Sequence, residues 1–195
     1  EKDGETHFVD LKSRRDRIKG SNYELGFDGD SIWVDADTSY KGKPAFYHNL
    51  YFYFYAMPFV LADDGIIYSK AEPITVDSVT YSGIHIGFKD GVGQVSLDEY
   101  ILYYHPETYQ MAWLGYTVTF FSKERSKKFK WINYNKWATF SDDIVLPTEL
   151  TWYSSDEDGK ITTLRKSVEF KNTSINKRPF DDETFQRTEN AVTVE

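Results

Sequence analysis

The sequence predicts a mainly β protein of the α+β class, in which a single curved antiparallel sheet forms a half-open barrel around one aromatic helix. Three observations support this fold class. Strand-like segments separated by turn residues occupy most of the chain. One stretch, residues 44–62, is long and aromatic enough to form a helix in the concave face of the sheet. The segment 109–121 carries apolar side chains on both of its faces, so both faces of the sheet must be covered.

The sequence pattern of the N-terminal part of the chain predicts a β-meander. Short strands are expected at residues 6–11, 23–27 and 31–34, with turn residues between them. The Asp28-Gly29 pair supplies the positive φ values that a tight hairpin needs. We therefore expect residues 23–27 and 31–34 to pair as a hairpin.

The aromatic stretch 44–62 should be one helix that begins near Pro44 and ends or kinks at Pro58. It is apolar nearly all round, which indicates burial on more than one side. His48 and the interruption at Pro58 leave it short of the about 20 apolar residues that a membrane span needs. We expect His48 to be a core histidine with its hydrogen bonds satisfied.

Seven strands should follow the helix, with sequential neighbours paired antiparallel because short turn sequences connect them. In the last strand apolar residues alternate with polar ones, which predicts one solvent-exposed face. The expected strands are residues 74–80, 83–88, 99–104, 109–121, 129–139, 149–153 and 161–170.

Length and composition favour a single domain that spans residues 1–195. A chain of 195 residues suits one hydrophobic core, and no repeat, linker or low-complexity tract divides it. Because the chain starts at Glu1 without methionine, we expect it to be a processed or trimmed product, with any export signal upstream of it.

The charge and the cysteine count exclude several functions. A net charge of -8 disfavours nucleic acid as a partner, because the protein would repel a polyanion. The chain has no cysteine, so thiolate metal sites, disulfides and cysteine nucleophiles are excluded. The four histidines lack the spacing of a zinc site, and no phosphate-binding motif opens a helix. We therefore expect no cofactor and no metal.

Two groups of motifs resemble known families. The segments FDGDSIWV (residues 27–34) and VEFKNTSINKRPFDDETF (residues 168–185) resemble the lipoprotein-carrier superfold of LolA and LolB. The segments FYHNLYFYFYAMPFVLADDGI (46–66) and MAWLGYTVTFFSKE (111–124) resemble an uncharacterised family of exported or lipid-anchored proteins of Bacteroidota. The resemblance implies a periplasmic or envelope-anchored location, close to a membrane rather than spanning it. It also implies that this chain lacks the export signal and the N-terminal helix that such proteins carry. It also implies a concave surface that holds a lipid, and it transfers no catalytic residue.

Aromatic side chains are the compositional outlier, at 17% of the chain. Large rings build a core, and they also line apolar ligand cavities with polar tips at the mouth. Our first hypothesis is a non-enzymatic module that binds a lipid or another hydrophobic small molecule. The side chains expected to line its site are Tyr51, Phe54, Tyr55, Trp113, Trp131 and Trp152.

Two alternatives remain open. A hydrolase or isomerase could use Asp63, Asp64 or His85 in the same concavity, because acid–base chemistry needs paired titratable groups in a cleft. A structural envelope protein with a filled core would bind no ligand.

Overall fold

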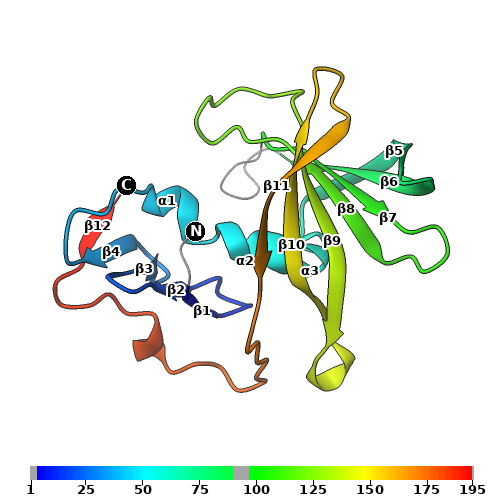
Figure 1. Cartoon of the computed structure of the whole chain (residues 1–195). Helices are drawn as coiled ribbons and strands as arrows, with labels where there is room; N and C mark the ends of the chain where they lie inside the picture. The colour runs from blue at the N-terminus through cyan, green and yellow to red at the C-terminus, as the bar shows by residue number, and fades with distance from the viewer. Residues whose placement is uncertain (1–3, 90–96, 195) are drawn as a thin grey trace. The chain divides into compact units, whose positions relative to one another are not determined.

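The computed structural model describes residues 4–89 and 97–194 of the chain (Figure 1). The chain divides into two compact units. The first unit comprises Glu1–Phe54 and Asn176–Glu195, and the second comprises Tyr55–Ile175. Whether the whole chain behaves as the single domain that the sequence predicts stays a prediction.

The first unit contains a five-stranded antiparallel sheet in the order β1-β2-β3-β4-β12. The predicted hairpin is present between β3 and β4, where Gly29 has a φ of 108° and the Asp28 carboxylate accepts the backbone N–H groups of Asp30 and Ser31 at 2.9 and 2.8 Å. The strands are β1 (Thr6–Val9), β2 (Asp16–Lys19), β3 (Tyr23–Phe27), β4 (Ile32–Ala36) and β12 (Val192–Val194).

Both faces of this sheet are buried. On one face the fully buried Ile18 and Leu25 pack with Val34 and Tyr47. The C-terminal segment is tied to the opposite face, where the Arg17 guanidinium donates to the carbonyl oxygen of Thr184 at 3.2 Å. The unit therefore has its own hydrophobic core on each side of a small sheet.

The aromatic stretch forms three short helices instead of the one helix that we expected. They are α1 (Pro44–Tyr47), α2 (Leu50–Tyr55) and α3 (Met57–Val60). Aromatic residues have only modest helix propensity, and Pro58, in the first turn of α3, lacks the N–H that a continuous helix would use. The first break falls at His48 and Asn49, where the chain turns His48 toward β2.

The second unit contains a seven-stranded antiparallel sheet in the order β11-β10-β9-β8-β7-β6-β5, which fans out in Figure 1. Six of the seven strands correspond to predicted ones. The expected strand at residues 74–80 instead spans the turn at Asp77 and Ser78 between β5 and β6, so most of β5 was not predicted. The strands β5 and β11 are the two edges, so the sheet is not closed into a barrel. The strands are β5 (Ile66–Val76), β6 (Val79–Phe88), β7 (Tyr100–Tyr104), β8 (Met111–Tyr116), β9 (Lys130–Thr139), β10 (Val145–Ser155) and β11 (Ile161–Glu169).

The mainly β class is confirmed, but the expectation of a single sheet is wrong. The C-terminal strand β12 pairs with β4 and so completes a separate sheet from the N-terminal meander. The prediction that β11 has one solvent-exposed face and one buried face is also wrong. As an edge strand it is exposed on both faces, and Leu164 is 57% exposed.

Candidate functional site

The strand register assigns the aromatic side chains of the second unit to two opposite faces of its sheet. Tyr103 pairs with Trp113, whereas Leu114 pairs with Ile132 and Ile132 with Trp152. Since neighbouring residues of a strand point to opposite faces, these pairs define two surfaces. The Trp113 face carries Tyr103, Trp113, Trp131 and Tyr153, and the Trp152 face carries Leu114, Ile132, Leu150 and Trp152.

The Trp113 face is filled by side chains of the sheet itself. Tyr103, Trp113 and Trp131 form one buried cluster, and partly buried residues of both edge strands, Ile74 and Ile161, pack against it. The Trp131 indole N–H donates to the carbonyl oxygen of Gly159 at 3.0 Å. Both edges reach the same cluster, so the sheet curls over this face.

The Trp152 face combines apolar side chains with buried polar tips. Leu114, Ile132 and Leu150 are fully buried. The Trp152 indole N–H donates to the Tyr116 hydroxyl at 3.2 Å, and both side chains are buried. This face therefore holds a polar pair within an apolar surface.

Further polar groups lie on the same face. Tyr134 is 2% exposed, and burial raises the pKa of its hydroxyl well above 10.0. Such burial favours the neutral hydroxyl, which can both donate and accept a hydrogen bond. At the exposed edge, the Lys166 ammonium lies 4.6 Å from the centroid of the Trp152 ring.

Tyr55 covers the Trp152 face beside β10 and β11. Its ring centroid lies 4.3 Å from that of Phe170, and its hydroxyl donates to the Thr173 side chain at 3.0 Å. Phe170 shares its face with Val168, which pairs with Leu150. Burial raises the pKa of the Tyr55 hydroxyl.

The structure thus divides the six predicted ligand-lining residues. Trp113 and Trp131 lie together on one face, and Tyr55 and Trp152 on the other, because Trp152 pairs with Ile132 rather than with Trp131. A one-residue step in register inverts the face of a side chain. Tyr51 and Phe54 belong to the first unit, where Tyr51 packs edge-on against His7 and Tyr47. Their joint role in a ligand site stays a prediction.

The alternative catalytic residues are not brought together. Asp63 and Asp64 are exposed in the turn after α3. His85 Nε2 lies 3.3 Å from a carboxylate oxygen of Glu99, and the Asp63–Gly65 turn meets β6 at Lys89. His85 is four residues away from Lys89, which is about 13 Å along a strand.

A buried acid–imidazole pair in the first unit escaped the sequence reasoning. Asp16 Oδ2 lies 2.6 Å from His48 Nδ1, and the two side chains are 3% and 2% exposed. Asp16 Oδ1 and His48 Nε2 are also buried but have no hydrogen-bond partner, so the expectation of a fully satisfied His48 is wrong. Desolvation raises the pKa of Asp16, although the hydrogen bond from His48 opposes this. Asp16 and His48 are 32 positions apart, and no pattern in the sequence indicates that they form a pair.

A second polar network lies in the same unit. The Glu5 carboxylate accepts the Tyr47 hydroxyl at 2.8 Å and also the Tyr23 hydroxyl, and it lies 3.2 Å from His7 Nε2. Burial and the Glu5 charge together raise the pKa of Tyr47. The first unit therefore concentrates ionisable side chains, whereas the interior of the Trp152 face of the second unit is apolar with neutral tyrosine and indole groups, and Lys166 lies at its exposed edge.

Neither a metal-ion site nor a membrane-spanning helix occurs within residues 4–89 and 97–194. No three His, Asp or Glu side chains gather there closely enough to hold a metal ion. None of the helices in these ranges has the length and apolar character needed to cross a membrane.

Comparison with known proteins assigns the chain to a family. The model of a family of unknown function, DUF6503, matches residues 38–169, which is more than half of the chain. The chain belongs to this family. No curated protein matches the DUF6503 chain.

Two solved structures resemble this DUF6503 protein. A LolA superfamily protein from Nitrosomonas europaea has a TM-score of 0.47 at 9% identity, over 89% of this chain and 76% of that one. A DUF1329 family protein from Desulfovibrio piger has a TM-score of 0.44 at 14% identity, over 93% of this chain and 81% of that one. Neither match supports an origin in Bacteroidota.

Proposed function

We propose that this DUF6503 protein is an exported, non-enzymatic binding module that holds a lipid or another hydrophobic ligand against the Trp152 face. The observation that carries the proposal is the buried Trp152–Tyr116 hydrogen bond within an otherwise apolar surface. Rings with apolar bodies and polar tips hold the chain of a hydrophobic ligand and orient its polar end.

The Trp152 face suits a ligand better than the Trp113 face does. On the Trp113 face a Cβ atom added to Gly83 would lie 2.7 Å from the Tyr103 ring, so the packing leaves no spare room there. On the Trp152 face, Tyr55 makes side-chain contacts and no ladder hydrogen bonds. Breaking side-chain contacts of this kind costs less free energy than separating a strand from its hydrogen-bonded neighbours.

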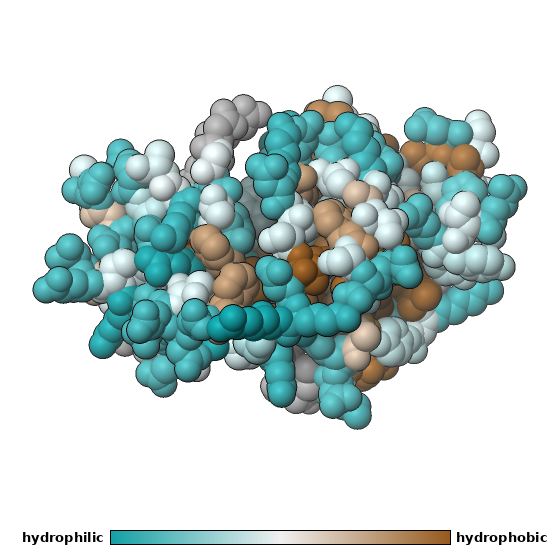
Figure 2. Space-filling view, turned by 90° about the horizontal axis from the view of Figure 1, so that it is seen from below, coloured by the Kyte–Doolittle hydropathy of each residue, from teal (hydrophilic) through white to brown (hydrophobic). Residues whose placement is uncertain are grey.

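Exposed apolar side chains offer an entry route. Phe59 on α3 is 49% exposed, and Tyr68 on the edge strand β5 is 55% exposed. The Tyr68 hydroxyl donates to the carbonyl oxygen of Leu61, so these two elements lie side by side. Figure 2 shows hydrophobic residues among hydrophilic ones at the protein surface. Exposed apolar groups of this kind are typical of ligand entrances and membrane contacts.

Tyr55 and Trp152 are the two predicted residues that the proposal assigns to direct ligand contact. Trp113 and Trp131 support the sheet from behind. A periplasmic or lipid-anchored location, near a membrane and without a nucleic-acid partner, belongs to the same proposal. It is supported by the sequence resemblance and the acidic charge.

Native mass spectrometry of the freshly purified chain, followed by organic extraction and lipid analysis, tests the proposal without a guessed ligand. We expect a stoichiometric adduct that extracts as a lipid or fatty acid. A fluorescent fatty-acid analogue should then bind the wild type, and Trp152→Leu should weaken it about tenfold through lost ring contact. Tyr109→Leu, at an aromatic side chain that is 75% exposed in the turn before β8, is the control. A folded protein that carries no adduct and binds no analogue would refute the proposal and favour a structural role.

A second candidate function, acid–base catalysis, is favoured by the Asp16–His48 pair. A carboxylate that accepts the Nδ1–H of a histidine orients the imidazole as a general base that acts through Nε2. Nε2 of His48 is buried, so this function requires the packing around it to open. Hydrolysis of 4-nitrophenyl acetate by the wild type and by His48→Gln tests it. Equal rates across pH 5–9 would exclude this candidate.

A further inference from the structure

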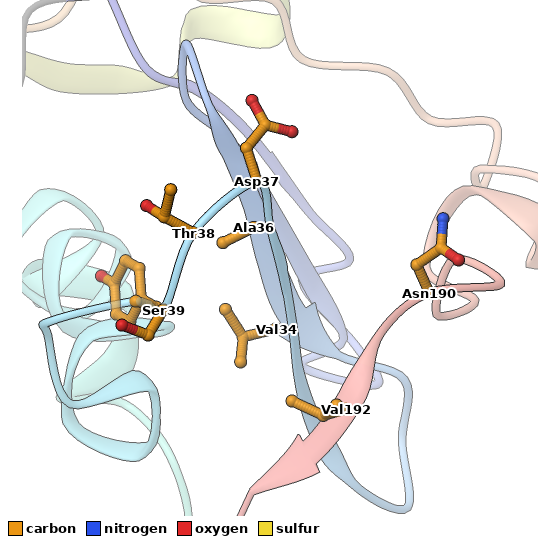
Figure 3. A pocket seen from close by; sticks show the side chains of 8 residues that line it. Val34, Ala36, Asp37, Thr38, Ser39, Asn190 and Val192 are labelled. Atoms are coloured by element: carbon orange, nitrogen blue, oxygen red, sulfur yellow. The ribbon is translucent and has the colours of Figure 1, made fainter.

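A small cavity of about 270 Å³ opens in the first unit beside β4 and β12 (Figure 3). Its floor is apolar and consists of the buried Val34 with Ala36 and with Val192, which is itself 60% exposed. Four polar side chains and one tyrosine surround this floor: Asp37, Thr38, Ser39, Asn190 and Tyr40. Figure 3 shows Asn190 on the opposite side of the floor from Thr38 and Ser39.

The polar rim offers hydrogen-bonding groups that the protein does not use. Within the described part of the chain, the side chains of Asp37, Thr38, Ser39 and Asn190 make no hydrogen bond to another residue. The neighbouring Asp35 differs, because its carboxylate accepts the Thr188 hydroxyl. Together the four free side chains present a carboxylate, an amide and two hydroxyls, which include both donors and acceptors.

The walls of the cavity are held in place. The Tyr40 ring lies 5.1 Å from the Tyr23 ring, and a Cβ atom added to Gly42 would lie 2.5 Å from Tyr40 Cε1. Glycine at position 42 therefore lets the backbone pass directly under the ring. On the other side, the Ala191 N–H donates to the Thr188 carbonyl oxygen at 3.2 Å, which fixes the turn that carries Asn190. Pre-ordered walls reduce the entropy cost of binding.

We infer that this cavity binds a saccharide through one monosaccharide ring. The apolar floor and the Tyr40 ring suit the C–H face of a sugar, and the rim groups suit its hydroxyls, which both donate and accept. The lining contains no lysine or arginine and the chain has a net charge of -8, so an anionic ligand is disfavoured. The volume is too small for an acyl chain. This site is separate from the hydrophobic ligand proposed for the second unit.

Titration of the ¹⁵N-labelled full chain, followed by amide chemical shifts, tests the inference. The probes are N-acetylglucosamine and the methyl glycosides of glucose, galactose and mannose. A ligand of this size should bind with a dissociation constant of about 1 mM. We expect saturable shifts confined to residues 34–40 and 190–192. Removing one hydrogen-bonding side chain by Asp37→Ala or Asn190→Ala should weaken binding about 2- to 10-fold.

Asn176→Ala, an exposed asparagine outside the cavity, is the matched control and should bind like the wild type. Choline chloride and sodium acetate are the charged control ligands. The inference is overturned if no saccharide gives saturable shifts at 50 mM, if the shifts lie elsewhere, or if choline or acetate alone moves residues 34–40. An unchanged amide spectrum away from the cavity shows that each variant is folded.

Discussion

Replacing Asp16 by alanine should destabilise the first unit severely. His48 is 2% exposed and its Nδ1 has Asp16 as its hydrogen-bond partner, while Nε2 already has none. Removing one partner of a buried pair of ionisable side chains costs about 3–5 kcal/mol. A whole domain is stable by only about 5–15 kcal/mol, so the loss is a large part of the total. Asp16→Asn keeps an acceptor for His48 and should cost less, about 1–3 kcal/mol.

The same pair predicts a pH dependence with a definite sign. Burial raises the pKa of Asp16 above its ordinary value of 3.8, so the folded state holds this proton more tightly than the unfolded chain does. The stabilisation that Asp16 provides is fully present at pH values below its pKa in the unfolded chain. It is lost as the pH rises through the pKa of Asp16 in the folded protein. Asp10 and Asp28, whose pKa values are lowered, act in the opposite direction. The difference between wild type and Asp16→Asn isolates the contribution of Asp16.

Hydrogen exchange of β2 and β3 measured by mass spectrometry is the suitable assay, with urea unfolding followed by fluorescence. Trp33 is the one tryptophan within the first-unit ranges, and selective replacement of the other four makes it a local reporter. If Asp16→Ala lies within about 1 kcal/mol of the wild type, the buried pair is not the anchor described here. If the wild type and Asp16→Asn show the same pH dependence, the raised pKa is wrong.

Three further changes test the packing. Gly26→Ala should disrupt the β2–β3 pairing, because the new Cβ would lie 2.2 Å from the Asp16 carbonyl oxygen, and hydrogen exchange of β3 should rise. Trp131→Phe removes the hydrogen bond to Gly159 and should cost about 1 kcal/mol in urea unfolding, with the fold retained. Tyr55→Phe loses the hydroxyl contact with the segment after β11, and it should lower the melting temperature by a few degrees only, since one hydrogen bond contributes about 0.5–1.5 kcal/mol. Unchanged stability in all three variants would contradict this packing.

Strands were predicted far better than contacts between them. Turn chemistry and alternation are local, so the Asp28-Gly29 hairpin and six of the seven strands of the second unit could be located from the sequence. The expected strand at residues 74–80 was wrong, because it spans the turn between β5 and β6. The face that Trp152 occupies could not, because it depends on the register with β9 and on irregular pairing near Tyr153. The breaks within residues 44–62 depend on tertiary contacts such as that of His48, which override the local helical pattern.

The segment that matches the DUF6503 model includes the residues of one proposed site and lacks key residues of the others. Residues 38–169 include all seven strands of the second sheet, and with them Trp152 and Tyr116, but they exclude Asp16, Asp37 and Asn190. A hydrophobic site on the Trp152 face is therefore the proposal that other DUF6503 proteins can test. The acid–imidazole pair and the saccharide cavity depend on residues beyond the matched segment. Because the proposed sites belong to different units, Asn190→Ala should leave fatty-acid binding unchanged and Trp152→Leu should leave saccharide binding unchanged.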